Sequence, residues 1–152
     1  MRSASVYLRR GCYFIQSEWY TTAGVGILSG PAIAVFEEGG LNEDGLAILG
    51  QAIVSALDGS RCDVPHPTDW KAVPSSMPPL AGVKSWRAFE KLATSIEVAE
   101  DEAGPIVLTP NVYLGPREGY ESVPSKRVRV TREDPTLLGK LAVKLLGEAA
   151  GR

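Results

Sequence analysis

The chain has 152 residues, of which 44% are hydrophobic and 22% are charged. A chain of this length buries roughly 70% of the surface that it exposes when unfolded, which is enough for one hydrophobic core without disulfides or metal ions. The composition is ordinary for a globular protein and excludes intrinsic disorder. We therefore expect a single domain over residues 1–152 that folds on its own.

The formal net charge is -2 and the sequence pI is near 5.5. A weakly negative molecule does not attract nucleic acid or an anionic membrane surface. No stretch approaches the roughly 18 apolar residues that a membrane span needs, and residues 1–10 lack the apolar core of a signal peptide. We therefore expect a cytoplasmic protein with no nucleic-acid partner and no membrane partner.

The two cysteines, Cys12 and Cys62, do not form a CxxC pair. This spacing excludes a disulfide framework and a zinc site of the usual kind. We expect two buried thiols in a reducing compartment, because free cysteine is among the most buried residue types. No metal and no cofactor are expected.

The first 36 residues predict an antiparallel arrangement of strands. Apolar residues alternate from Ser5 to Ser17 around a tight turn at residues 9–11, which is typical of a hairpin. Residues 21–27 and 32–36 predict two more strands, because the Gly-Pro step between them cannot continue a sheet ladder.

Two amphipathic helices follow from capping residues and apolar periodicity. Asn42 is an N-cap for a helix that ends at Asp58-Gly59, and Asp134-Pro135 begins a helix that runs to Glu148. Each helix has one apolar stripe that is suited to packing on a sheet. The stripe residues are Leu46, Leu49, Ile53 and Leu57 in the first helix, and Leu138, Leu141 and Leu145 in the second.

The middle of the chain predicts a long ordered loop and further short elements. Residues 60–82 contain five prolines and are expected to be neither regular helix nor strand. Ser85 caps a short helix that runs to Ala93, residues 96–98 and 106–108 form a second hairpin, and residues 128–130 form a strand. The expected class is α+β, with a largely antiparallel sheet of about six to seven strands packed by two main helices and one short helix.

One candidate catalytic group is His66, the only histidine of the chain. It lies in the proline-rich loop with Cys62 and Asp69, so a small hydrolase that uses His66 with one of them is an alternative. No recognisable nucleophile motif and no second metal ligand accompany this histidine, which favours a structural role in the loop. We assign no catalytic residue and expect that the protein is not an enzyme.

A second alternative is a nucleic-acid-binding module. Lys126, Arg127, Arg129 and Arg132 lie along the strand at residues 128–130, and Tyr113 or Tyr120 could stack on bases. Four charges are few and the whole molecule is acidic. A solvated outer face of an edge strand is therefore the favoured interpretation.

Acidic residues gather at two turns of the expected fold. They either serve ordinary turn and helix-start chemistry or dock a basic partner, and the sequence favours neither. Their spacing does not match a calcium loop. The first turn has Glu37, Glu38, Glu43 and Asp44, and the second has Glu97, Glu100, Asp101 and Glu102.

The most distinctive stretch is Asn111 to Gly119. Gly115-Pro116 forces a turn and Gly119 permits a second sharp bend. Arg117 in this loop has two possible roles, an internal pairing with a carboxylate or carbonyl and a contact with a partner, of which the internal pairing is favoured.

Three motifs together resemble the immunity proteins of contact-dependent growth inhibition (CDI) systems. They are Pro-His-Pro-Thr-Asp-Trp at 65–70, Gly-Val-Lys-Ser-Trp at 82–86 with Phe89, and the stretch 111–119 followed by Tyr120. The last motif is the most specific. It resembles an NLGPREGF loop, although here the asparagine and leucine are separated and tyrosine stands where phenylalanine is common. The motif residues are His66, Asp69, Trp70, Trp86, Phe89, Gly115, Pro116, Arg117 and Gly119.

The resemblance implies a small cytoplasmic protein that binds the toxic C-terminal domain delivered by a neighbouring bacterium, often a nuclease, and blocks it. It implies a binding protein rather than an enzyme. It also implies that the motif residues hold the fold, so the surface that contacts the toxin is expected at the two acidic turns instead. The oligomeric state stays open. The expected toxin-binding residues are Glu37, Glu38, Glu43, Asp44, Glu100, Asp101 and Glu102.

Overall fold

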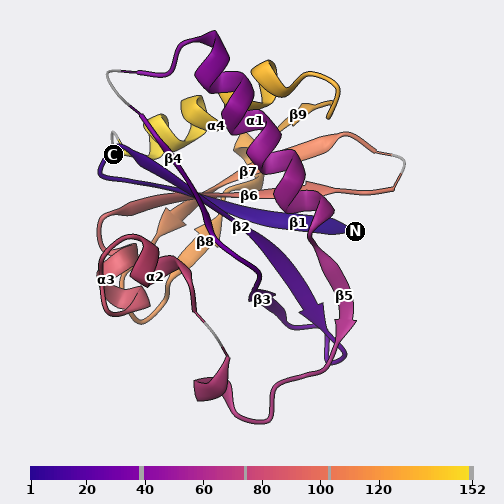
Figure 1. Cartoon of the computed structure of the whole chain (residues 1–152), viewed down its shortest axis with the longest axis vertical. Coiled ribbons are helices and arrows are strands. Elements are labelled where there is room, and N and C mark those ends of the chain that lie inside the picture. Colours follow the sequence, from indigo (N-terminus) through magenta and orange to yellow (C-terminus); the bar gives the residue numbers. More distant parts are fainter. Residues whose placement is uncertain (38–39, 74, 103, 151–152) are drawn as a thin grey trace.

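The computed structural model describes residues 1–37, 40–73, 75–102 and 104–150 (Figure 1). Within these ranges, two long helices lie together on one face of a curled β-sheet, and two short helices lie near the other end of the molecule. No helix in the described ranges is long and apolar enough to cross a membrane.

Nine strands occur among the described residues, and six of them form one continuous path. The long helices are α1 (Glu43–Asp58) and α4 (Pro135–Ala150), and the short ones are α2 (Met77–Leu80) and α3 (Trp86–Glu90). The strands are β1 (Arg2–Arg9), β2 (Cys12–Thr21), β3 (Gly26–Leu28), β4 (Ile33–Phe36), β5 (Arg61–Val64), β6 (Ala93–Glu100), β7 (Ile106–Tyr113), β8 (Tyr120–Ser122) and β9 (Val128–Val130).

The continuous path runs β3-β2-β1-β6-β7-β8 with antiparallel pairing throughout. β4 and β9 pair antiparallel with β2 and β7, whereas β5 runs parallel to β2. The predicted hairpin at the start of the chain is present, and its turn residues Arg10 and Gly11 both have positive φ, as a two-residue turn of matching twist requires. The predicted α+β class with a largely antiparallel sheet is confirmed.

The main hydrophobic core lies between the sheet and the two long helices. Side chains alternate across a strand, so Ala4 and Val6 of β1 point to this face together with Ile96 and Val98 of β6. The predicted apolar stripes of both helices are buried against them. Asn42 caps α1 through its side-chain oxygen, which accepts a hydrogen bond from the backbone N–H of Gly45 at 2.8 Å, as expected.

A second, smaller core covers part of the opposite sheet face. Phe89 of α3 is fully buried at its centre and packs edge-to-face on Tyr7, Phe14 and Trp86, with ring centroids 5.2 to 5.5 Å apart. Such edge-to-face geometry suits the charge distribution of aromatic rings. Met77 of α2 completes this core. The two short helices therefore cover part of the sheet face opposite α1 and α4.

Three expectations about the strands and loops were wrong in detail. Residues 21–27 are not one strand, because β2 extends to Thr21 and a turn separates it from β3. Residues 60–82 are not irregular throughout, because they contain β5 and α2. The stretch 111–119 is not entirely loop, because β7 continues to Tyr113 and pairs with β8, a strand of three residues that is too short to show a periodicity in the sequence.

The two long helices touch at two glycines. A Cβ atom on Gly50 of α1 would collide with the carbonyl oxygen of Pro135, and a Cβ atom on Gly139 of α4 would collide with the carbonyl oxygen of Leu46. Backbone therefore meets backbone at this crossing, and neither helix can retreat without opening the main core. Gly147, further along α4, has nothing within 4 Å of its Cβ position.

We predict that Gly50→Ala and Gly139→Ala each lower the free energy of unfolding by about 1–3 kcal/mol or more, because overpacking at a backbone contact forces the helices apart. Gly147→Ala is the matched control and is expected to raise it by about 0.5–1 kcal/mol, since alanine is the better helix former. Urea denaturation of the three variants measures these differences. Equal free energies of unfolding for Gly50→Ala and Gly147→Ala would show that the close backbone contact at Gly50 does not contribute to stability.

Candidate functional site

An open groove of about 900 Å³ lies where the first and last parts of the sheet meet the end of α1. The start of β1, the segment 60–62, the turn between β6 and β7, and the connection from β9 to α4 surround it. The lining residues are Met1, Arg2, Ser60, Cys62, Glu100, Asp101, Glu102, Gly104, Pro105, Thr131, Arg132 and Glu133. We call it the acidic groove.

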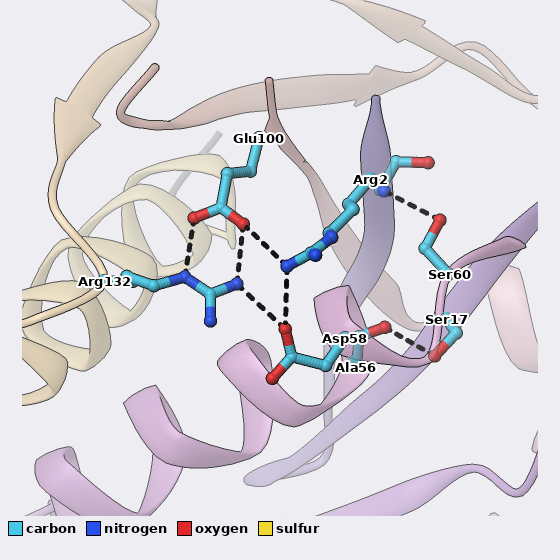
Figure 2. Close-up of polar contacts among 8 residues, drawn as sticks. Arg2, Ser17, Ala56, Asp58, Ser60, Glu100 and Arg132 are labelled. Carbon is cyan, nitrogen blue, oxygen red and sulfur yellow. Dashed lines mark hydrogen bonds and ion pairs between the residues drawn. The ribbon is translucent and has the colours of Figure 1, made fainter. Parts of the chain in front are cut away.

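Four charged side chains form an ion-pair network at one wall of the acidic groove (Figure 2). The guanidinium of Arg132 donates to both carboxylate oxygens of Glu100, at 2.9 and 2.6 Å, and also to Asp58 Oδ1 at 2.9 Å. Arg2 Nη1 lies 3.0 Å from the same Asp58 oxygen and 3.7 Å from Glu100 Oε1. The network thus joins β1, α1, β6 and the segment before α4.

Burial decides which of these charges matter for the fold. The side chain of Glu100 is only 9% exposed, whereas those of Arg2 and Asp58 are about half exposed. The hydrogen bonds with Glu100, and then those with Asp58, raise the pKa of Arg132 above its ordinary value. A nearly buried carboxylate held by a bidentate guanidinium is a structural element, because without Arg132 the Glu100 carboxylate would be a nearly buried charge that has lost its main partner.

The second acidic turn is therefore divided between two roles. Glu100 faces inward and belongs to the network, while Asp101 and Glu102 are exposed at the rim of the acidic groove together with Glu133. Among the described residues, no cation lies within salt-bridge distance of these three carboxylates. The rim consequently presents negative charge to solvent, whereas the charges of the network are neutralised internally.

The first acidic turn lies at the opposite end of α1. Glu43 and Asp44 are exposed in the first turn of this helix, and Glu37 accepts a 3.4 Å hydrogen bond from the hydroxyl of Tyr13. Glu38 lies outside the described residues. Because α1 has 16 residues and ends at Asp58 beside the network, the two acidic turns are separated by about 22 Å. The structure does not bring them together into one patch.

The contacts of His66 do not resemble those of a catalytic base. Its Nδ1 lies 2.9 Å from Thr21 Oγ1, and its ring packs edge-on against Trp70 with centroids 5.3 Å apart. Asp69 instead caps the following 3₁₀ turn by accepting from the backbone N–H of Lys71. No hydrogen bond among the described residues joins His66 to Cys62 or Asp69, so the groups of the proposed hydrolase are not assembled.

Two expectations about single residues were wrong. Cys12 is buried as expected, but Cys62 is exposed at the acidic groove. Arg117 was expected to pair internally, yet it is exposed and forms none of the ion pairs of the described chain. Within the described ranges, no three histidine, cysteine, aspartate or glutamate side chains are gathered as metal ligands.

The structure separates Arg132 from the other three basic residues of this segment, Lys126, Arg127 and Arg129, which are exposed. The guanidinium of Arg132 is hydrogen-bonded within the ion-pair network, and Val130 is buried in the main core. Tyr120 packs on Tyr7 and Tyr113 and donates its hydroxyl to the carbonyl oxygen of Ala93 at 2.9 Å. Burial raises the pKa of Tyr120, and this half-buried ring packs against the second core and lines, with Tyr113, a pocket of about 190 Å³.

The motif residues divide into buried and exposed groups. Phe89 and Trp86 pack in the second core, as a structural role requires, but Trp70 is 51% exposed. Gly115 and Gly119 have φ of 106° and 68°, which explains why glycine occupies both positions of the loop between β7 and β8. Pro116 follows the first of these glycines and is exposed at the surface.

The sequence alone did not point to Arg2, Asp58 or Arg132. These residues belong to elements that are far apart along the chain, and none lies in a motif of recognisable spacing. The network becomes visible only once the strand order brings the start of β1 beside the end of β6. No local signal could have found it.

Comparisons with known proteins identify the fold. Neither a protein-family model nor a curated protein matches the sequence. The structure is similar to a protein of unknown function from Neisseria meningitidis, with a TM-score of 0.72 and 17% identity over 99% of this chain and 94% of that one. It is also similar to a chain in the CdiA-CT/CdiI toxin and immunity complex from Yersinia pseudotuberculosis, with a TM-score of 0.69 and 14% identity over 97% and 96% of the two chains. At these identities the similarity establishes a shared fold.

We predict that Glu100→Gln lowers the free energy of unfolding by about 1–3 kcal/mol, because it removes the nearly buried charge that the Arg132 guanidinium holds. Glu102→Gln, in the same turn but exposed, is the matched control and is expected to change it by less than about 0.5 kcal/mol. Chemical denaturation at neutral pH tests both. Equal effects of the two substitutions would contradict a structural role for the network.

Proposed function

We propose that this chain is a CDI immunity protein, which binds and neutralises the toxic C-terminal domain of a cognate toxin. The observation that carries the proposal is the fold shared over nearly the whole length of both chains with a protein from a CdiA-CT/CdiI complex. The resemblance of three sequence motifs to CDI immunity proteins supports it independently. The partner is accordingly a protein domain.

The chemistry of the surface supports a binding protein rather than an enzyme. His66, Cys62 and Asp69 are not assembled, and the best-defined polar cluster, the ion-pair network, is internally neutralised. A neutralised network holds a surface rigid but offers no group that could attack or protonate a substrate. Rigid, preorganised surfaces bind protein partners tightly, because little conformational freedom is lost on association.

We infer that the toxin is a nuclease. A domain that cleaves nucleic acid needs positive charge around its cleft to hold phosphates. The exposed carboxylates of Asp101, Glu102 and Glu133 at the acidic groove present the complementary charge. Complementary charge raises the rate of encounter and disfavours partners of the wrong sign. The second acidic turn is therefore assigned a steering role, and the first, at the far end of α1, is not.

We predict that the tagged protein captures the toxic domain encoded beside it at a 1:1 ratio and abolishes its activity with nanomolar affinity, about -12 kcal/mol. Titration of the captured domain's nuclease activity against the added protein measures both stoichiometry and inhibition. A domain that is captured but stays active would contradict neutralisation. Failure to capture any neighbouring domain would remove the function proposed here.

The steering role predicts a specific salt dependence. Asp101→Asn/Glu102→Gln is expected to lower the association rate by about tenfold at low salt and to flatten its dependence on ionic strength. Glu43→Gln/Asp44→Asn removes the same charge at the other end of α1 and is expected to change the rate by less than about twofold. Stopped-flow kinetics between about 20 and about 500 mM salt, over which the screening length falls about fivefold, separate the two pairs. Identical behaviour of both pairs would contradict local steering.

A further inference from the structure

The short helices α2 and α3 pack on part of the sheet face opposite α1 and α4. Further along this face, β1 contributes the buried Ser3 and Ser5, and the hydroxyl of Ser3 donates a 3.2 Å hydrogen bond to the hydroxyl of Tyr20 on β2. Glu18 of β2 lies directly across from Ser3, and Glu97 of β6 lies directly across from Ser5. Residues paired across a ladder share a face, so the two carboxylates flank the central strand on the same side of the sheet.

The surroundings keep both carboxylates in place. The carboxylate of Glu18 occupies the position that a Cβ atom would take at Gly26 of the neighbouring strand β3. Glu97 is exposed and accepts a 3.3 Å hydrogen bond from the hydroxyl of Ser122. Burial, and then the charge of Glu97, raise the pKa of Glu18 above its ordinary value. Burial and the neighbouring charge thus both disfavour the ionised form of Glu18.

No cation of the described chain relieves this repulsion. Arg9 and Arg129 point to the same face by register, on β1 and on the outer strand β9. The guanidinium of Arg9 lies over the ring of Phe89, 5.9 Å from its centroid, and neither arginine forms an ion pair with the described carboxylates. Among the described residues, no ion pair therefore neutralises Glu18 or Glu97.

An aromatic pocket of about 320 Å³ adjoins the carboxylates. Its floor includes Gln16, which lies across from Ser5, and Leu28, which lies across from Glu18. Trp70 and Trp86 form its walls, and Trp70 is half exposed. A half-exposed tryptophan beside a polar floor is the kind of residue that dominates binding energy at protein interfaces. The pocket and the two carboxylates form one continuous surface, which we call the trough.

We propose that the trough is the docking site for the toxin, and that it receives a basic side chain between Glu18 and Glu97 while an apolar side chain enters the pocket beside Trp70. This inference rests on the proposed function and names the surface that performs it. Two features carry it: two carboxylates that form no ion pair with the described cations, and an adjoining aromatic pocket walled by the half-exposed Trp70.

The charge of the trough also defines what it excludes. Nucleic acid and acidic peptides would bring negative charge next to Glu18 and Glu97, which costs several kcal/mol for close like charges at an interface. A guanidinium or ammonium group from a nuclease surface brings the charge that is missing. The acidic rim at Asp101 and Glu102 follows directly after β6, so a partner steered to the acidic groove arrives at the end of the trough.

The test compares the affinity of the captured toxic domain for a set of single-charge variants, measured by calorimetry. Glu97→Gln is expected to weaken binding at least about tenfold, Glu18→Gln/Glu97→Gln at least about a hundredfold, and Trp70→Ala at least about tenfold. Glu121→Gln is the matched control, because Glu121 is exposed on β8 and pairs with Val112, which places it on the other face. It is expected to change the affinity less than about twofold.

A second measurement reports the protonation of the Glu18 carboxyl group. Carbon-13 NMR of the glutamate carboxyls is expected to show a raised pKa for Glu18 in the isolated protein and a lower one in the complex, because an arriving cation favours the charged form. Thermal unfolding of each variant checks that the fold is kept, which is expected since removing one of two repelling charges does not weaken the main core.

The outcomes separate this inference from the function on which it rests. If the domain binds and is inhibited, but the Glu18, Glu97 and Trp70 variants bind as well as the Glu121 variant, the trough is not the docking site and the immunity function stands. A pKa of Glu18 that stays unchanged in the complex likewise overturns the trough. If the unaltered protein captures no toxic domain, both the function and the docking site fail.

Discussion

The close backbone contacts of Gly50 with Pro135 and of Gly139 with Leu46 set the geometry on which the other features depend. They bring the backbones of α1 and α4 together near the start of α4, so the segment that carries Arg132 is held close to the last turns of α1. Eight residues, or about 12 Å of helix, separate Gly50 from Asp58. Arg132 thereby meets Asp58 and Glu100 at the edge of the sheet. A crossing at which two helix backbones touch directly thus positions an ion-pair network whose members come from four separate segments.

The charges of the molecule fall into two groups that the fold keeps apart. Arg2, Arg132, Asp58 and Glu100 neutralise one another and stabilise the junction of four segments. Glu18, Glu97 and the rim of the acidic groove have no such partners among the described cations. The small net charge of -2 therefore hides a local excess of negative charge on one side of the molecule. Whole-molecule charge is a poor guide to a surface when some charged groups neutralise one another inside a network and others stay exposed without an ion pair.

Local signals in the sequence predicted the elements that have local causes. Asn42, Ser85 and Asp134 each cap a helix through the predicted side-chain oxygen, and the apolar stripes of α1 and α4 face the core. The short strands β5 and β8 could not be predicted, because three or four residues carry too little periodicity and their pairing depends on distant neighbours. The same limit applies to the site. Acidic residues at turns were visible as a pattern, but the inward orientation of Glu100 and the placement of Glu18 and Glu97 on one sheet face follow from strand order and register.

The separation of the trough from both hydrophobic cores has a consequence for the evolution of the binding surface. The interactions that hold the chain together lie between the sheet and the two long helices, and in the small aromatic core around Phe89. Glu18, Glu97 and Trp70 belong to neither core. Substitutions at these residues can alter charge and shape without unfolding the domain, so a lineage of such proteins can exchange one binding specificity for another in single steps. A scaffold divided in this way is suited to following a partner that itself changes, because stability and recognition are under separate selection.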